Sequence, residues 1–137
     1  MKRMSVLFII FALLLMIVIP VNAEVSDKWK PSFNLKQTDW GKEDTSLQTA
    51  VVVFILADWA QTRYIASNPE FIETNPILGP NPSIEEVDQY FAICALGNTA
   101  IAYFLPKKFR KWWQVLSLST QINFVNHNYN LGVKMQF

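Results

Sequence analysis

The most constraining feature of this chain is an apolar run over residues 47–66 that contains one acidic residue, Asp58. A helix of that length is roughly 30 Å long, close to the thickness of a bilayer core. Thr45 and Gln48 fit a capping box and predict a helix start near Thr45. The sequence Ser-Asn-Pro at 67–69 predicts its end. The chain must therefore fold around a long apolar helix that carries a charge.

Asp58 shares one face of this helix with Gln61 and Thr62, because these residues lie at positions i, i+3 and i+4. A carboxylate on an apolar helix is costly unless it is paired. We therefore expect Asp58 to be buried and bonded to another element. The candidates are the backbone amides and Asn75 of the following loop, Asn98, and the polar face of a third helix.

The loop over residues 67–82 holds four of the seven prolines, and three of them follow an asparagine. Each of the first two Asn-Pro pairs predicts a single helical turn, so the loop that carries Glu73 should be folded. After it, Ser83 and Glu86 form a second capping box. This box predicts a helix from Ser83 to Leu105, which stops before a proline.

A third helix is expected from about Lys108 to Asn126. Cations and tryptophans gather at its start, as they do at membrane–water boundaries. Thr120, Asn123 and His127 form a polar stripe further along. The alternating tail after residue 128 predicts a strand that pairs with an extended segment at 29–35. The expected membrane-interface residues are Lys107, Lys108, Arg110, Lys111, Trp112 and Trp113.

The N-terminus has the pattern of a secretory signal peptide: two cations, an apolar segment, and small residues before a cleavage site after Ala23. An uncleaved anchor helix is the alternative. The predicted organisation is a signal peptide at 1–23, an extended polar arm at 24–46 and a helical membrane-associated domain at 47–137. This places the protein in a bacterial cell envelope, at the inner membrane facing the periplasm, with a soluble periplasmic protein as the alternative.

Composition supports the same class. Hydrophobic residues make up 51% and charged residues 17%, below the 25% or so that is usual for soluble domains. The net charge of +1 gives no basic field for nucleic acid. The lone Cys94 cannot form an intrachain disulfide and fits a small apolar position in a helix. We predict an all-α fold: a small bundle of about three helices with a short N-terminal arm and a C-terminal tail.

Two kinds of site are compatible with the polar residues. Asp58, Glu73 and His127 could converge as metal ligands or as acid and base. A metal site usually shows more histidines or tighter spacing, so no metal and no cofactor are expected. The alternative is a structural or binding role. The residues expected to form this site are Asp58, Gln61, Thr62, Glu73, Asn75 and His127.

Part of the chain resembles uncharacterised families of small bacterial helical membrane proteins. Asp58 and Thr62 in an apolar helix, followed by "ETNPILG" before the next helix, match their Asp-x-x-x-Thr and Glu-x-Asn-Pro elements. The resemblance covers residues 47–105. It implies a small helical membrane protein and carries no activity.

We therefore expect an exported envelope protein that acts as an accessory or interaction module and is not an enzyme. Its expected partners are membrane lipid and another membrane or envelope protein. Two alternatives remain open at this point. One is a membrane-embedded hydrolase that uses Asp58, Glu73 and His127, and the other is a pore or lysis-type protein.

Overall fold

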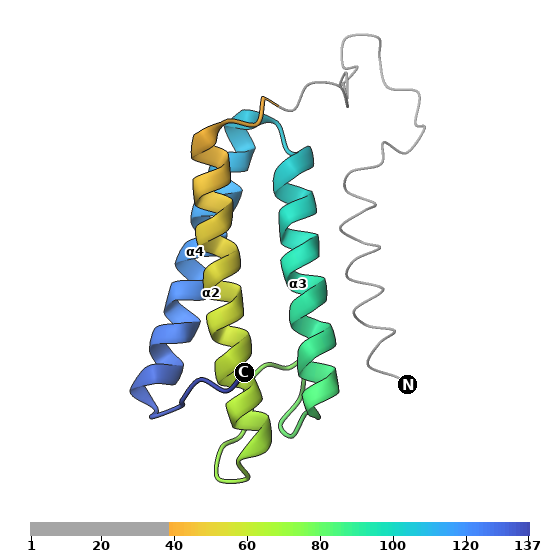
Figure 1. Cartoon of the computed structure of the whole chain (residues 1–137), viewed down its shortest axis with the longest axis vertical. Helices are drawn as coiled ribbons and strands as arrows, with labels where there is room; N and C mark the ends of the chain where they lie inside the picture. The colour runs from red at the N-terminus through yellow and green to blue at the C-terminus, as the bar shows by residue number, and fades with distance from the viewer. Residues whose placement is uncertain (1–38) are drawn as a thin grey trace. The chain divides into compact units, whose positions relative to one another are not determined.

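The protein is a bundle of three helices over the residues that the computed structural model describes, 39–137 (Figure 1). The helices are α2 (Lys42–Ser67), α3 (Ile84–Phe104) and α4 (Lys107–Asn130), and this part of the chain contains no strand. α2 and α4 run in the same direction and α3 runs against them. The predicted all-α fold is confirmed. None of these three helices combines the length and apolar character needed to cross a membrane.

α2 begins about one turn earlier than the sequence predicted. The Gly41 N–H donates to the carboxylate of Asp44 at 2.8 Å, so an acidic residue near the positive helix end supplies the cap. Thr45 lies inside the first turn, where its hydroxyl donates to the Gly41 carbonyl at 3.2 Å. The predicted capping box of Thr45 and Gln48 was therefore wrong, because Gly41 and Asp44 form the cap and the helix starts three residues before Thr45. The predicted end at Ser67, just before Asn68-Pro69, is confirmed.

α3 begins as its capping box predicted. The Glu86 N–H donates to the Ser83 hydroxyl oxygen at 3.2 Å, and the Ser83 N–H donates to the Glu86 carboxylate at 2.9 Å. The α2–α3 loop is also folded, because the Gly79 N–H donates to the Asn75 carbonyl at 2.8 Å and closes a turn. Gly79 has a φ of 77°, a conformation that glycine adopts without a side-chain clash.

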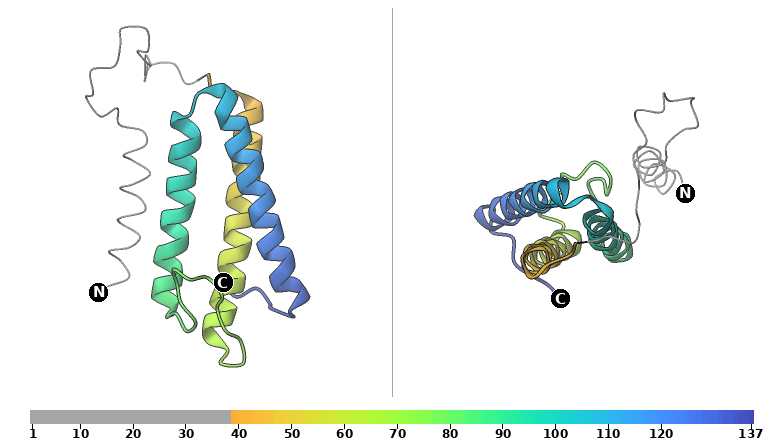
Figure 2. Two further views of the ribbon diagram at one scale, coloured as in Figure 1. Left: turned by 180° about the vertical axis from the view of Figure 1, so that it is seen from behind. Right: turned by 90° about the horizontal axis from the view of Figure 1, so that it is seen from above.

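A small apolar core joins α2, the loop and α3. Val51, Ile55, Leu78, Val87 and Phe91 form one buried cluster. Leu78 from the loop is 5% exposed, so it anchors the loop to both helices. α4 packs mainly on α2 and contacts α3 little, and Figure 2 shows the three helices from behind and from above.

The C-terminal tail packs on α2 without forming a strand. The chain turns after Leu131, Val133 is buried, and the Gln136 N–H donates to the Ala60 carbonyl at 2.9 Å. The prediction of a terminal strand was therefore wrong, because the backbone of the tail bonds to a helix. Its expected partner at 29–35, the signal peptide at 1–23 and most of the arm at 24–46 lie outside the described residues.

Candidate functional site

A partly polar seam runs along the buried side of α2. Its buried side chains recur at alternating spacings of four and three residues, which is the spacing of a helix packed along one seam. Four of the seven are polar, so neighbouring elements must supply hydrogen bonds to them. These seven residues are Asp44, Gln48, Val51, Ile55, Asp58, Thr62 and Ile65.

Asp58 lies in this seam and is 8% exposed. The side-chain amide of Asn128 on α4 donates to its Oδ1 at 3.2 Å. The structure therefore confirms that Asp58 is buried and paired, and the partner comes from the third helix. Asn98, another expected candidate, lies near the opposite end of the bundle, where its Oδ1 accepts from Gln48 at 3.0 Å.

The pKa of Asp58 is raised from 3.8 to about 7, chiefly by burial and in smaller part by the negative charge of Glu73. A single neutral donor, the amide of Asn128, does not offset these effects. The carboxyl group therefore changes its charge close to neutral pH. Such a shift marks a group whose protonation can alter the fold or a reaction.

Glu73 and Asn75 are brought to this end of the bundle by the α2–α3 loop. The Glu73 carboxylate accepts the Asn75 N–H at 2.7 Å, and the Glu73 N–H donates to the Pro80 carbonyl at 3.1 Å. The Asn75 side chain accepts the Ile77 N–H at 3.0 Å. These bonds fix the loop, so both residues have a local structural function, in line with the structural alternative stated from the sequence.

α3 places Tyr90 and Cys94 close to Asp58, and Tyr90 also close to Asn75. Burial raises the pKa of Tyr90 to about 12 and also raises the pKa of Cys94, so both side chains remain uncharged at neutral pH. Asn75 lies against the Tyr90 side chain, and the charge of Asp58 contributes to both shifts. Tyr90 was not among the residues expected from the sequence, although it lies one turn before Cys94 on the same helix face.

Gln61 and Thr62 are buried with Asp58, being 1% and 3% exposed. The Gln61 amide nitrogen donates to the Val125 carbonyl on α4 at 3.2 Å, while its Oε1 has no donor among the residues described. The expected shared face of α2 is therefore present, and it points toward α4. Together with the Asp58–Asn128 bond, it attaches the C-terminal half of α4 to α2.

His127 does not join the carboxylates. It is exposed on α4, and no hydrogen bond or ion pair links it to Asp58 or Glu73. Thr120 and Asn123, the other members of the expected polar stripe, are exposed as well. The stripe therefore faces away from the bundle. The next residue, Asn128, makes the contact with Asp58 that was expected of His127.

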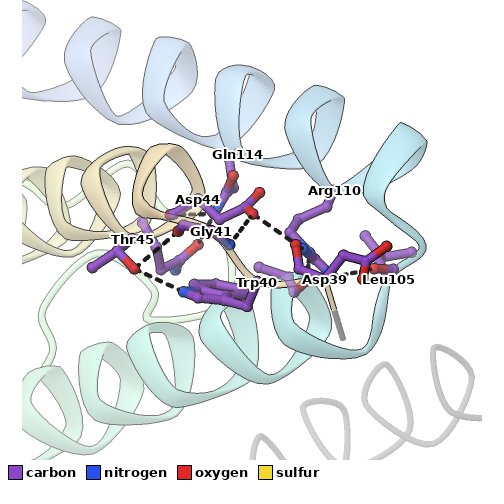
Figure 3. A network of polar contacts seen from close by, with 10 residues as sticks. Asp39, Trp40, Gly41, Asp44, Thr45, Leu105, Arg110 and Gln114 are labelled. Carbon is purple, nitrogen blue, oxygen red and sulfur yellow. Dashed lines mark hydrogen bonds and ion pairs between the residues drawn. The ribbon is translucent and has the colours of Figure 1, made fainter. Parts of the chain in front are cut away.

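A second polar cluster lies at the opposite end of the bundle, and Figure 3 shows it from close by. Arg110 is 1% exposed, and its guanidinium donates to the Ala102 and Leu105 carbonyls at 3.1 Å each. It also pairs with the Asp44 carboxylate at 3.2 Å and lies over the Trp40 ring at 5.1 Å. Arg110 thus ties the end of α3 to the start of α2.

Gln114 continues this cluster along α4. Its amide nitrogen donates to the Asp44 carbonyl at 2.9 Å and to Gln48 Oε1 at 3.3 Å. On the next turn Asn98 donates to the Ser117 hydroxyl oxygen at 2.8 Å. The spacing of residues 110, 114 and 117 could have identified this inward stripe in the sequence.

The expected membrane-interface residues separate into two groups. Lys107, Lys108, Lys111 and Trp112 are exposed. Arg110 is buried, and Trp113 is half-buried with its indole N–H donating to the Asn98 carbonyl at 3.3 Å. Arg110 therefore lies inside the bundle, and Trp113 packs partly against it.

Over residues 39–137, no three His, Cys, Asp or Glu side chains are placed to hold a metal ion. A hollow of about 170 Å³ lies where α2 meets the proline loop, and its lining, which includes Ile65, Phe71 and Pro80, has no ionisable side chain. Comparison with family models, curated proteins and solved structures found no match to this chain. The geometry of the chain itself must therefore carry the functional argument.

Proposed function

We propose that the protein is an exported, membrane-associated module of the bacterial cell envelope that acts as an accessory through its contacts. The observation that carries this proposal is the orientation of α4. Its buried residues are Arg110 and Gln114, while large apolar side chains lie on its outer surface. A helix packed in water normally shows the opposite arrangement.

The outer surface of α4 is rich in aromatic and aliphatic side chains. The exposed fraction of Trp112 is 66% and that of Leu116 is 62%. Large apolar side chains exposed in such number on one helix favour contact with a membrane or another protein. The large apolar residues exposed along the helix are Phe109, Trp112, Val115, Leu116, Ile122, Phe124 and Tyr129.

α3 extends this surface toward the α3–α4 turn. Leu96 is 73% exposed, and Tyr103 and Phe104 are 45% and 53% exposed. The two rings pack edge to face, with centroids 5.4 Å apart, so they present a fixed apolar surface. Near the α3–α4 turn, exposed apolar side chains of both helices are therefore available to a partner or a lipid layer.

The polar residues support a role in holding the module together. Asp58 binds Asn128 across the α2–α4 interface, and Glu73 organises its own loop. The hydrolase alternative requires His127 beside these carboxylates, and its exposed position gives that alternative no support. We therefore assign the six expected site residues to the architecture of the module or to contacts.

Alkaline carbonate washing of membranes from expressing cells tests this proposal. The processed protein should stay in the membrane pellet, and the double variant Leu116→Ser/Phe124→Ser should shift toward the wash, because two exposed apolar contacts are lost. Asn123→Ser is the matched control on the same helix. Complete release of the wild-type protein, or equal retention of all three proteins, would overturn the proposal.

A partner can be identified with a photo-crosslinking residue placed on the same helix. Insertion at position 112 should capture lipid or an envelope protein, and insertion at position 45, on the exposed start of α2, should capture less. Equal capture at the two positions would count against a contact surface on α4.

A further inference from the structure

Three exposed lysines and four exposed aromatic rings lie near the turn where α3 meets α4. We name this surface the basic corner, and its residues are Tyr103, Phe104, Lys107, Lys108, Phe109, Lys111 and Trp112, all of them exposed. We propose that the basic corner binds the anionic phospholipid headgroups of a bilayer leaflet, with its aromatic side chains entering the interface. This inference rests on the proposed function and names the lipid class and the orientation of the module.

Two of the lysines are available for a ligand. Lys107 and Lys108 form no ion pair with any residue in the range 39–137. Lys111 pairs with Glu43 at 2.6 Å, and both side chains are more than 60% exposed. An exposed pair of this kind is weak and can open. The corner can therefore offer two or three ammonium groups to phosphate.

The two ends of the bundle differ in charge, so an anionic membrane surface would orient the module with the basic corner toward it. The opposite end, residues 68–88, has no lysine or arginine. An anionic surface attracts one end of such a molecule and repels the other. The acidic residues of the opposite end are Glu70, Glu73, Glu85, Glu86 and Asp88, and of these Asp88 is paired with Arg63 of α2 at 2.7 Å. The fold separates these charges, because α3 runs from the acidic end to the basic corner.

The rings beside the lysines favour a lipid leaflet over an acidic protein. Phe109 is 57% exposed and Trp112 is 66% exposed, and rings at a membrane boundary sit at the level of the headgroups while lysines reach the phosphates. Exposed apolar side chains recur along α4 from Phe109 to Phe124, with the exposed polar residues Thr120 and Asn123 between them, over a distance of about 22 Å. A leaflet can cover such a long convex surface without a matching groove.

Site-specific fluorescence on the processed protein tests the orientation. In a Cys94→Ala background, an environment-sensitive dye is attached through Trp112→Cys or, at the acidic end, through Asn81→Cys, since both positions are exposed. The probes are vesicles of phosphatidylcholine alone and vesicles that also contain phosphatidylglycerol. The dye at position 112 should respond to the anionic vesicles, and the dye at position 81 should respond far less.

Charge variants test the headgroup contact. A lysine near an anionic surface contributes about 1 kcal/mol, which is roughly a fivefold change in binding. Lys107→Gln/Lys108→Gln should therefore weaken binding to the anionic vesicles about 25-fold. Lys134→Gln, an exposed lysine in the tail, is the control and should change binding less than twofold. Added salt should weaken binding of the wild-type protein more than that of the double variant.

The outcomes separate this inference from the proposed function. An equal response of the dye at position 112 to both kinds of vesicle would leave membrane association standing and overturn the anionic preference. An equal response of the two dyes would overturn the orientation. If the dye at position 112 responded to neither kind of vesicle and the apolar surface bound a protein instead, the proposed lipid contact would be wrong.

Discussion

Asp58 is a carboxyl group whose ionisation the folded protein opposes. Burial removes the water that would stabilise its charge, and the nearby charge of Glu73 adds repulsion. The hydrogen bond from Asn128 is compatible with either protonation state of the carboxyl group. Stability near neutral pH should therefore depend on this one residue.

The pKa of Asp58 is raised from 3.8 to about 7 on folding, so between these pH values the folded protein binds a proton that the unfolded chain has lost. The free energy of unfolding should fall as the pH rises through this range. Asp58→Asn removes the ionisation, so it should gain up to about 4 kcal/mol over the wild-type protein between pH 4 and pH 8. Urea denaturation of both proteins at the two pH values measures this gain.

Glu73→Gln is the matched control for this prediction. It removes the repelling charge and keeps an oxygen acceptor for the Asn75 N–H, so the pKa of Asp58 should fall and the loss of stability should be smaller. If Asp58→Asn and the wild-type protein had parallel pH profiles, the raised pKa would not belong to Asp58.

The burial of Asp58 was predictable, because a charge within an apolar run needs a partner in any fold. The identity of that partner was not. His127 and Asn128 are consecutive residues, and consecutive residues point about 100° apart on a helix. Which of them faces α2 depends on the rotation of α4 about its axis, and tertiary packing sets that rotation.

At the scale of elements, Arg110 is the residue that connects the three helix ends. Its guanidinium binds the last carbonyls of α3 and the Asp44 carboxylate at the start of α2. Arg110→Met should cost about 3–5 kcal/mol of unfolding free energy, because it leaves a buried charge unpaired and removes the donor from three carbonyls, those of Asp39, Ala102 and Leu105. Chemical denaturation measures this loss.

Two further variants separate this cluster from ordinary surface charge. Lys111→Gln breaks an exposed ion pair and should change the unfolding free energy little. Asp44→Asn added to Arg110→Met removes the unpaired charge and should recover part of the loss. If Arg110→Met were as mild as Lys111→Gln, the guanidinium would not hold the helix ends together.

The boundaries of α3 could be predicted because local side chains fix them: Ser83 and Glu86 at the start and Pro106 after the end. The orientation of α4 could not. This helix has one polar stripe through Arg110 and Gln114 and another through His127, and the usual rule places apolar residues inside. In this bundle the buried polar residues of α2 bind the polar stripe of α4 that contains Arg110 and Gln114. The inner face of α4 can therefore be assigned only when its pairing with α2 is known.

For the whole molecule, the proposed function depends on what precedes the bundle. A retained apolar segment at 6–19 would hold the protein in a membrane regardless of the surface of α4. If the segment is removed, the exposed residues of α3 and α4 must provide the attachment. The state of the N-terminus therefore decides how much the basic corner has to contribute.

We expect cleavage after Ala23, because Val21 and Ala23 lie where signal peptidase accepts small residues. Intact mass spectrometry of the protein recovered from membranes should give a chain that begins at Glu24. The control is Ala23→Asp, which should block cleavage and leave a chain that starts at Met1 and resists carbonate washing. If the wild-type protein already kept Met1, the apolar segment would be an anchor, and substitutions at the basic corner should then change the orientation of the bundle without releasing it from the membrane.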